Sequence, residues 1–367
     1  MECLLHRVPM RDPGDVSALE RLIDDGLIAA HEIVAVLGKT EGNGCVNDFT
    51  RAYATMTVAN ALARHLGIMA EEVAARVAIV MSGGTEGGLS PHFLVCSVRQ
   101  GDAKRRNGKS LAIGRASTPA LLPEQIGRLP QVTATAIAVS EAMVSAAIAD
   151  AADVHWVQVK CPLLTKERIV EAASRGQSTA TADPYASMGL SRAASALGTA
   201  LALGEVDRTR IDDHVIGRDF QLRSSRASAS AGIELMHNEI IVLGNSAAWS
   251  GDNLIGHGVM RDAIDAPSVI DVLQRLDFPI AGQLAEAAAA RIRAVLAKAE
   301  ASRDGTIRGA CHIMSDDSDI PATRHARALV GGVLAGIVGR TDLFVSGGAE
   351  HQGPDGGGPV AVIARRP

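Results

Sequence analysis

The sequence predicts an α/β fold built from three copies of one unit arranged about a common axis. Three short segments, far apart in the chain, share the pattern Ser, Gly or Ala, Gly, any residue, Glu. Each follows an amphipathic helical segment and, further upstream, an apolar strand-like run that carries a lysine. Because strand and helix signals recur in the same order three times, internal repetition of one α/β unit is expected.

Each copy of the pattern begins with a serine: Ser82, Ser230 and Ser346. Apolar, β-type runs at residues 77–81 and 343–345 lead directly into the first and third serines. The middle serine follows a Ser-rich stretch that starts at Ser224, so its strand is less clear. A lone serine before glycine is usually a turn residue, and it is the repetition that favours a functional role.

An amphipathic helix with an arginine in its expected first turn precedes each serine. The helices are predicted at residues 48–66, 191–206 and 323–338, and the arginines are Arg51, Arg192 and Arg324. Asp48, Ser191 and Thr323 are the predicted N-caps. Positive charge in a first turn opposes the helix dipole. Three such arginines therefore favour a ligand-binding role, with salt bridges between repeats as the alternative.

Each unit also carries a lysine on or just after an apolar run: Lys39, Lys160 and Lys298. The order lysine, arginine, serine is the same in all three units, whereas the spacing varies as it does when loops change on a constant scaffold. We place the repeats at residues 1–103, 110–250 and 255–367. The basic residues 104–106 lie in a polar stretch and are expected to form a solvated linker.

Composition excludes several classes of protein. The formal net charge is −5, and no basic stripe of the kind that binds nucleic acid is present. The five cysteines show no Cys-x-x-Cys motif, which argues against a disulfide framework or a zinc cage. Residues 133–152 are the most apolar stretch, but they include Glu141 and Asp150 and favour a buried helix over a membrane span. We expect a cytoplasmic protein without a membrane or nucleic-acid partner.

Lysine is the candidate base for the serines. Serine is a weak nucleophile until a base takes its proton, and the 11 histidines show no regular relation to the three serines. A buried lysine surrounded by cations is neutral and able to act as that base. The backbone N–H groups next to each serine, at Gly83, Ala231 and Gly347, would hold a developing oxyanion. Such a ring of three similar clusters suits a small ligand with similar groups on several sides.

Four longer segments resemble the cyanuric acid hydrolase/barbiturase family of cyclic amide hydrolases: residues 38–48, 157–164, 229–235 and 345–354. The resemblance implies three α/β repeats with pseudo-three-fold symmetry around a central β-barrel, in a homotetramer. It also implies opening of cyanuric acid to carboxybiuret, which loses CO₂ to give biuret. No cofactor for catalysis is implied, and the substrate is a small cyclic imide.

The resemblance assigns roles to single residues. It makes Lys160 the base and Ser230 the nucleophile. The other two lysine–serine pairs, Lys39 with Ser82 and Lys298 with Ser346, would bind and polarise the remaining sides of the ring. Arg51, Arg192 and Arg324 would hold the ring carbonyls. One departure lies close to the nucleophile, where Arg226 places a bulky charge at a position whose orientation the sequence leaves open.

A cation site is also implied. The loop at residues 350–358 offers one acid, a glutamine and many carbonyl groups, although on composition alone it is a structural glycine loop. The resemblance favours structural Mg²⁺ or Ca²⁺ and gives as ligands Glu300, Ala349, Gln352, Gly353, Pro354 and Gly357. The assignment of Glu300 depends on a short match at residues 297–300.

Two other functions remain open from the sequence. A barbiturase would use the same serines, lysines and arginines on barbituric acid. A non-catalytic protein that binds cyclic imides would have no need of a nucleophile and a base, yet all three lysine–serine pairs are present. A peptidase that uses serine and lysine is disfavoured, because a three-fold pocket leaves no cleft for a chain.

Overall fold

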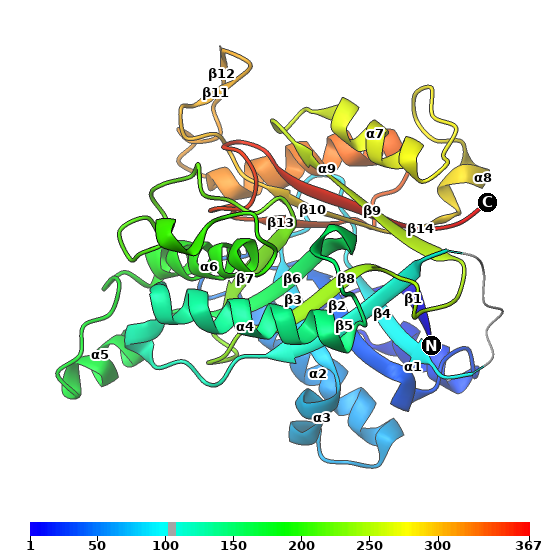
Figure 1. Ribbon diagram of the computed structural model, residues 1–367, viewed down its shortest axis with the longest axis horizontal. Coiled ribbons are helices and arrows are strands. Elements are labelled where there is room, and N and C mark those ends of the chain that lie inside the picture. The colour runs from blue at the N-terminus through cyan, green and yellow to red at the C-terminus, as the bar shows by residue number, and fades with distance from the viewer. Residues whose placement is uncertain (102–107) are drawn as a thin grey trace.

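The computed structural model describes residues 1–101 and 108–367 (Figure 1). The predicted α/β fold is confirmed: the described residues contain three four-stranded mixed sheets, each accompanied by helices. The predicted linker at residues 104–106 lies outside the described residues. No helix in the described ranges combines the length and hydropathy that a membrane span requires.

The first sheet has the strand order β1-β4-β2-β3. Its strands are β1 (Glu2–Pro9), β2 (Ile33–Thr40), β3 (Ala78–Gly83) and β4 (His92–Arg99). Its helices are α1 (Ser17–Asp24), α2 (Phe49–Leu66) and α3 (Ala70–Arg76). Strands β2 and β3 are parallel, and β4 is antiparallel to both β1 and β2.

The second sheet repeats this topology in the order β5-β8-β6-β7. Its strands are β5 (Ser110–Ser117), β6 (Val154–Pro162), β7 (Ala227–Gly232) and β8 (Glu239–Ser246). Its helices are α4 (Leu129–Ser145), α5 (Lys166–Ser174) and α6 (Pro184–Ala202). The middle serine therefore lies on a regular strand, β7, that the sequence pattern left uncertain.

The third sheet has the order β13-β10-β14-β9, again with one parallel pair, β10 and β13. Its strands are β9 (Asn253–Met260), β10 (Ile292–Ala299), β13 (Phe344–Gly347) and β14 (Gly358–Arg365). Its helices are α7 (Ala266–Arg275), α8 (Glu286–Ala289) and α9 (Ala322–Val338). A small hairpin of β11 (Thr306–Ile307) and β12 (Ala310–Cys311) extends from this part of the molecule (Figure 1).

One core joins the three sheets. Leu37 of β2, Val159 of β6 and Leu296 of β10 belong to the same cluster of buried apolar side chains. Neighbouring residues on these strands point the other way, as strand geometry requires. Val36 packs in the cluster that includes α2, and Val295 packs in the cluster that includes α9. Burial on both faces explains why the strands appear in the sequence as nearly continuous apolar runs.

The sheets do not form the closed central barrel that the resemblance implied. Strand pairing among the described residues stays within each set of four strands, and single bridges, Glu2 with Ser250 and Ser224 with Gln352, join one sheet to the next. The centre is thus closed by packed side chains. The sheets extend over residues 2–99, 110–246 and 253–365, while the exact repeat boundaries stay a prediction.

The first residues of two helices differ from those that the sequence analysis predicted. Asp48 caps α2 as predicted, with its side chain accepting a hydrogen bond from Thr50 N at 3.0 Å. Helix α6, however, starts at Pro184, so the predicted cap Ser191 lies inside it and Arg192 is in mid-helix. Asp183 and Pro184 provide the stronger start, because the aspartate accepts from free N–H groups and proline has none to satisfy.

Helix α9 differs by a smaller shift. It begins at Ala322, directly after Pro321, so Thr323 is its second residue and not its N-cap. Arg324 therefore lies in the first turn, as predicted.

Candidate active site

Strand register places each lysine directly opposite its serine. The Cα partners across the three parallel strand pairs are Lys39 and Ser82, Lys160 and Ser230, and Lys298 and Ser346. Residues paired in this way project to the same face of a sheet, and all six are buried. The varying spacing along the chain is therefore absorbed by the connections, while the lysine–serine relation is identical in each sheet.

The three serines meet at the centre of the molecule. Ser230 Oγ lies 3.1 Å from Ser346 Oγ, and Ser82 Oγ lies 3.4 Å from Ser346 Oγ. Each hydroxyl comes from a different sheet, so segments separated by more than a hundred residues contribute to one cluster. We call these three residues the serine cluster.

Lys39 and Lys298 hydrogen-bond to their own serines. Lys39 Nζ lies 3.2 Å from Ser82 Oγ, and Lys298 Nζ lies 3.3 Å from Ser346 Oγ. Each amine also donates to the carbonyl of the residue that follows its serine, at 3.3 and 3.0 Å respectively. Lys298 donates further to the carbonyl of Ala229, at 2.9 Å. Lys298 thus links the third sheet to the strand that carries Ser230.

Lys160 has different partners among the described residues. Its Nζ lies 2.7 Å from Glu234 Oε1 and donates to the carbonyl of Met81 at 2.8 Å. Met81 precedes Ser82 in the first sheet, and Glu234 follows Ser230 in the second. The amine of the middle unit is therefore held by a carboxylate of its own unit and a carbonyl of the first unit.

Burial lowers the pKa of all three lysines. For Lys298 the pKa falls to about 7, with burial as the largest cause and the Arg192 cation as the second. The pKa of Lys39 falls well below its ordinary value through burial and the Arg327 cation. Burial also lowers the pKa of Lys160, although the Glu234 carboxylate opposes this effect. Desolvation thus outweighs the crowding of cations expected from the sequence, and both favour neutral amines.

The arginines connect each unit to the next. Arg51 of α2 reaches the second sheet and donates to the carbonyl of Ala231 at 3.3 Å. Arg192 of α6 reaches the third and binds both carboxylate oxygens of Glu350, at 2.8 and 2.6 Å. Ala231 directly follows Ser230, and Glu350 lies four residues after its serine. The predicted arginines Arg51 and Arg192 are therefore in contact with serine segments.

The third arginine of this arrangement is Arg327, which the sequence analysis did not single out. Its buried guanidinium binds both oxygens of Glu86, at 2.7 and 2.5 Å. Gly84 makes room for it, because a Cβ there would lie 2.5 Å from Arg327 and the backbone φ is +105°. The predicted Arg324, one turn earlier on α9, has a 38% exposed side chain and only one contact with Glu86, at 3.1 Å.

The glutamates that end the repeated pattern are the other residues whose role the sequence analysis missed. They are Glu86, Glu234 and Glu350. In the first and third units the glutamate is bound by an arginine, and in the middle unit it contacts Lys160. Their recurrence four residues after each serine was the available signal, since a carboxylate repeated at a buried site needs a partner.

The predicted cation ligands lie close to the serine cluster. Glu300 follows β10 directly, and its pKa is raised by burial and by the neighbouring Glu350 carboxylate. The glycine loop packs against the same segment, since a Cβ on Gly356 would lie 2.8 Å from Ser302. Among the described residues, no cluster of three His, Cys, Asp or Glu side chains offers a metal site.

The loop supplies carbonyl groups more than side chains. Ala349 and Pro354 each accept one backbone hydrogen bond within the loop, at 2.9 and 3.0 Å. The Gln352 side-chain oxygen already accepts from Ala229 N at 2.7 Å, which leaves its main-chain carbonyl for a cation. One partly buried carboxylate, that of Glu300, beside several carbonyls fits a hard divalent cation.

Arg226 does not belong to the serine cluster. Its Nε lies 3.5 Å from Glu205 Oε1, and its Nη1 donates to the carbonyl of Ala151. The orientation that the sequence left open is thus toward the connection between α6 and β7 and the start of β6. The charge next to the nucleophile segment is neutralised outside the pocket.

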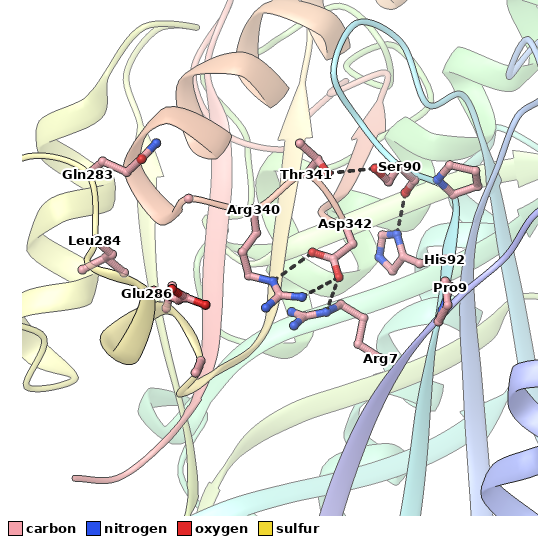
Figure 2. Close-up of a pocket in the computed structure, with 14 residues that line it drawn as sticks. Arg7, Pro9, Ser90, His92, Gln283, Leu284, Glu286, Arg340, Thr341 and Asp342 are labelled. Carbon is pink, nitrogen blue, oxygen red and sulfur yellow. Dashed lines mark hydrogen bonds and ion pairs between the residues drawn. The ribbon is translucent and has the colours of Figure 1, made fainter.

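A pocket between the first and third units lies away from the serine cluster (Figure 2). It has a volume of about 840 Å³. Two arginines dominate it, Arg7 and Arg340, and both point at Asp342, which lies 2.5 Å from Arg7 and 2.9 Å from Arg340 (Figure 2). One carboxylate neutralises both cations, and the pocket lacks the lysine–serine pairs of the centre. Its size therefore does not make it the candidate active site.

Comparison with known proteins identifies the family. The family described as "Amidohydrolase ring-opening protein (Amido_AtzD_TrzD)" matches residues 4–365. The chain belongs to this family. The ring-opening amidohydrolase is 55% identical to the cyanuric acid amidohydrolase of Enterobacter cloacae over all of both chains. It is 56% identical to that of Bradyrhizobium sp. (strain ORS 375), covering 99% of this chain and 97% of the relative.

Solved structures agree with the sequence comparison. The fold superimposes with a TM-score of 0.96 on a structure described as "Cyanuric acid hydrolase: evolutionary innovation by structural concatenation", at 54% identity and 99% coverage of both chains. The predictions of the family and of a hydrolytic enzyme are confirmed. This ring-opening amidohydrolase therefore carries its serine cluster on a fold shared with a cyanuric acid hydrolase.

Proposed function

We propose that this amidohydrolase opens cyanuric acid by hydrolysis to carboxybiuret, which then loses CO₂ to give biuret. The observation that carries the proposal is the serine cluster, in which Ser346 Oγ lies within 3.4 Å of both the Ser82 and the Ser230 hydroxyl, and each serine is opposite a buried lysine. Cyanuric acid has three equivalent carbonyls around one ring, so a site with three-fold symmetry complements it on every side. The names of the relatives support the same substrate.

Lys160 and Ser230 are assigned to the chemical step. Lys160 takes the Ser230 proton as Oγ bonds to a ring carbonyl carbon, whose π electrons move to the oxygen. When the carbonyl re-forms, the ring C–N bond breaks and the leaving nitrogen takes the proton from Lys160. Water then attacks the Ser230 ester, gives its proton to Lys160, and the lysine returns that proton to Oγ. The two residues are register partners, and such contacts often shorten only when substrate is bound.

The other two units would bind the remaining sides of the ring. Lys39 and Lys298 already contact Ser82 and Ser346, so these hydroxyls are oriented to donate toward a carbonyl. Buried cations near the cluster favour a ring in its deprotonated form. The N–H of Ala231, next to the nucleophile, would stabilise the oxyanion of the tetrahedral intermediate. Substrate binding and polarisation are thus divided among three similar sites.

Purified protein incubated with cyanuric acid is expected to consume it and release biuret and CO₂, because three equivalent donor sets match three equivalent carbonyls. Barbituric acid, which has a CH₂ in place of one ring N–H, is expected to react much more slowly. Loss of ring absorbance and chromatography of the products measure both reactions. Preference for barbituric acid would assign the chain to the barbiturase activity, and binding of both compounds without turnover would make it a binding protein.

A structural Mg²⁺ or Ca²⁺ is proposed at Glu300 and the carbonyls of Ala349, Gln352, Gly353, Pro354 and Gly357. The partly buried Glu300 carboxylate has a raised pKa and lies near a second carboxylate, which a cation would compensate. Adding either ion to chelator-treated protein is expected to raise Tm, since saturation at a hundred times Kd contributes about 2.7 kcal/mol. In Glu300→Gln the shift should disappear. If the ions left the Tm of the wild type unchanged, as they should in Glu300→Gln, the proposed cation site would be contradicted.

The proposal extends to a homotetrameric assembly and a cytoplasmic location. Helix α2 exposes Phe49, Tyr53 and Met56, which are spaced to lie on one face. An exposed apolar stripe of this kind supports contact with another subunit, in line with the proposed homotetramer. All five cysteines are free thiols, which supports a reducing, cytoplasmic environment.

A further inference from the structure

The middle unit differs from the other two in how its glutamate is used. Glu86 and Glu350 are each bound by an arginine from a neighbouring unit. The corresponding arginine that reaches the middle unit, Arg51 of the first unit, instead donates to the carbonyls of Ala231 and Cys45, at 3.3 and 2.8 Å. Glu234 is left to contact Lys160 at 2.7 Å. The three-fold pattern is thus broken in the contacts of a single carboxylate.

We propose that Glu234 is a positioning residue for Lys160, and this inference rests on the proposed function. The Glu234 carboxylate fixes the amine beside Ser230 and stabilises the ammonium that forms when the amine takes the serine proton. It does not touch the substrate and acts only through the lysine. This role distinguishes the middle unit, in which chemistry takes place, from the two units that bind the ring.

Hydrogen bonding explains how the contact orients the amine. A neutral lysine has two N–H donors and one lone pair. The amine donates one N–H to the carbonyl of Met81 at 2.8 Å, and its ion-pair contact with the Glu234 carboxylate at 2.7 Å holds it from a second side. The lone pair is then free for the hydroxyl proton of Ser230, the register partner of Lys160. The arrangement matches the general order of nucleophile, base and a third group that orients the base.

Local geometry holds the carboxylate in place. Glu234 is turned back onto its own strand end, and a Cβ on Gly232 would lie 2.1 Å from its Oε2. Glycine at this position is therefore required for the carboxylate to reach Lys160. Arg168 of α5 donates to the carbonyl of Ile233 at 2.8 Å and fixes the same turn.

The charges around Glu234 and Lys160 determine in which direction the pKa of Lys160 changes when the Glu234 charge is removed. Glu234 raises the pKa of Lys160, against the larger lowering by burial and a further lowering by Arg51. Cys161, on the same strand, also acts on Lys160, and Arg168 faces Glu234. Removing the Glu234 charge leaves burial and Arg51 opposed only by the weaker effect of Cys161, so the pKa of Lys160 falls further. The amine is then neutral over a wider pH range but is a weaker base.

Glu234→Gln tests the inference with cyanuric acid as substrate. The acid limb of the kcat/KM profile is expected to move to lower pH, and kcat on the plateau to fall about 10- to 100-fold, less than the roughly 10²–10⁴-fold that a general base contributes, because the base itself is retained. KM should change less than about threefold, because the ring is bound by the other groups. Glu234→Asp, which retains the charge, should restore part of kcat and move the acid limb back. It also covers the case in which the glutamine variant folds poorly.

Glu86→Gln is the matched control, since Glu86 holds the same position in the pattern but binds Arg327. Its expected effect is a higher KM without a shift of the acid limb. Equal pH profiles for the wild type and Glu234→Gln would overturn the positioning role, as would equal shifts in the Glu234 and Glu86 variants.

Acetylation of Lys160 by acetic anhydride as a function of pH, followed by peptide mass spectrometry, reports its pKa without turnover. A wild-type protein that leaves cyanuric acid intact would refute the proposed function. A lower pKa of Lys160 in Glu234→Gln would then still support the contact. An unchanged pKa would overturn the contact whether or not the enzyme turns over.

Discussion

Ser230→Ala is expected to lower kcat on cyanuric acid by at least about a thousandfold, while Kd for the ring stays within a few-fold of the wild-type value. The substitution removes the proposed nucleophile, and loss of a nucleophile of this type leaves only the contribution of binding and oxyanion stabilisation. Four polar groups of the neighbouring units remain in place: Lys39, Ser82, Lys298 and Ser346. Calorimetric titration with cyanuric acid and steady-state kinetics measure the two quantities separately.

The equivalent serines provide the controls. Ser82→Ala and Ser346→Ala remove hydroxyls of the same cluster, 3.4 Å apart, without removing the proposed nucleophile. Their expected effect is a higher KM with a kcat loss far smaller than that of Ser230→Ala. If Ser346→Ala or Ser82→Ala abolished the reaction and Ser230→Ala did not, the chemistry would belong to a different unit.

The fold was largely predictable because it depends on local signals. Alternating strands and helices recur three times. The buried strands are recognisable in the sequence as apolar runs, for example before Lys39 and Ser82. The predicted start of α6 was wrong because Ser191 resembles an N-cap residue. The actual N-cap signal, Asp183 before Pro184, lies two turns earlier. The closed barrel was not predictable for another reason. Sequence shows which strands exist, but not whether neighbouring sheets join by hydrogen bonds or by side-chain packing.

The site was predictable where each unit repeats itself, and unpredictable where units contact one another. The lysine–serine pairs lie within one sheet, so their order in the chain indicated them. The arginine–glutamate pairs cross between units: Arg192 with Glu350 and Arg327 with Glu86. No local pattern reports such a contact, so the sequence did not indicate Arg327 as the partner of Glu86, while the ring-binding role of Arg324 stays a prediction. The missed residue lies on the same helix, three positions away.

The repeated scaffold also explains why few side chains distinguish the three lysine–serine pairs from one another. Three copies of one register give three nearly equivalent lysines, all buried and all with lowered pKa. Backbone geometry therefore cannot make one serine reactive and the others passive. The distinction has to come from side chains that differ between units. The Glu234–Lys160 contact is such a difference, and it lies beside the serine assigned to the chemistry.

Arg327→Ala is expected to destabilise the protein by about 3–5 kcal/mol, because it leaves the buried Glu86 carboxylate without its main partner. Burial works to raise the pKa of Glu86, and the Arg327 cation holds it below its ordinary value. The pair thus contributes stability above the unfolded pKa of Glu86, and that contribution is lost as the pH falls through the lowered folded value. Denaturant unfolding between pH 3 and 8 measures both the loss and its pH dependence.

Two further variants separate this ion pair from a general packing effect. Arg324→Ala, on the same helix with a half-exposed side chain, is expected to cost less than about 1 kcal/mol. The double variant Arg327→Ala/Glu86→Gln should recover part of the stability, since it removes the buried charge together with its partner. Its acid dependence should also be weaker. A single Arg327→Ala variant as stable as Arg324→Ala would show that Glu86 finds another partner and that the link between the third and first units is dispensable.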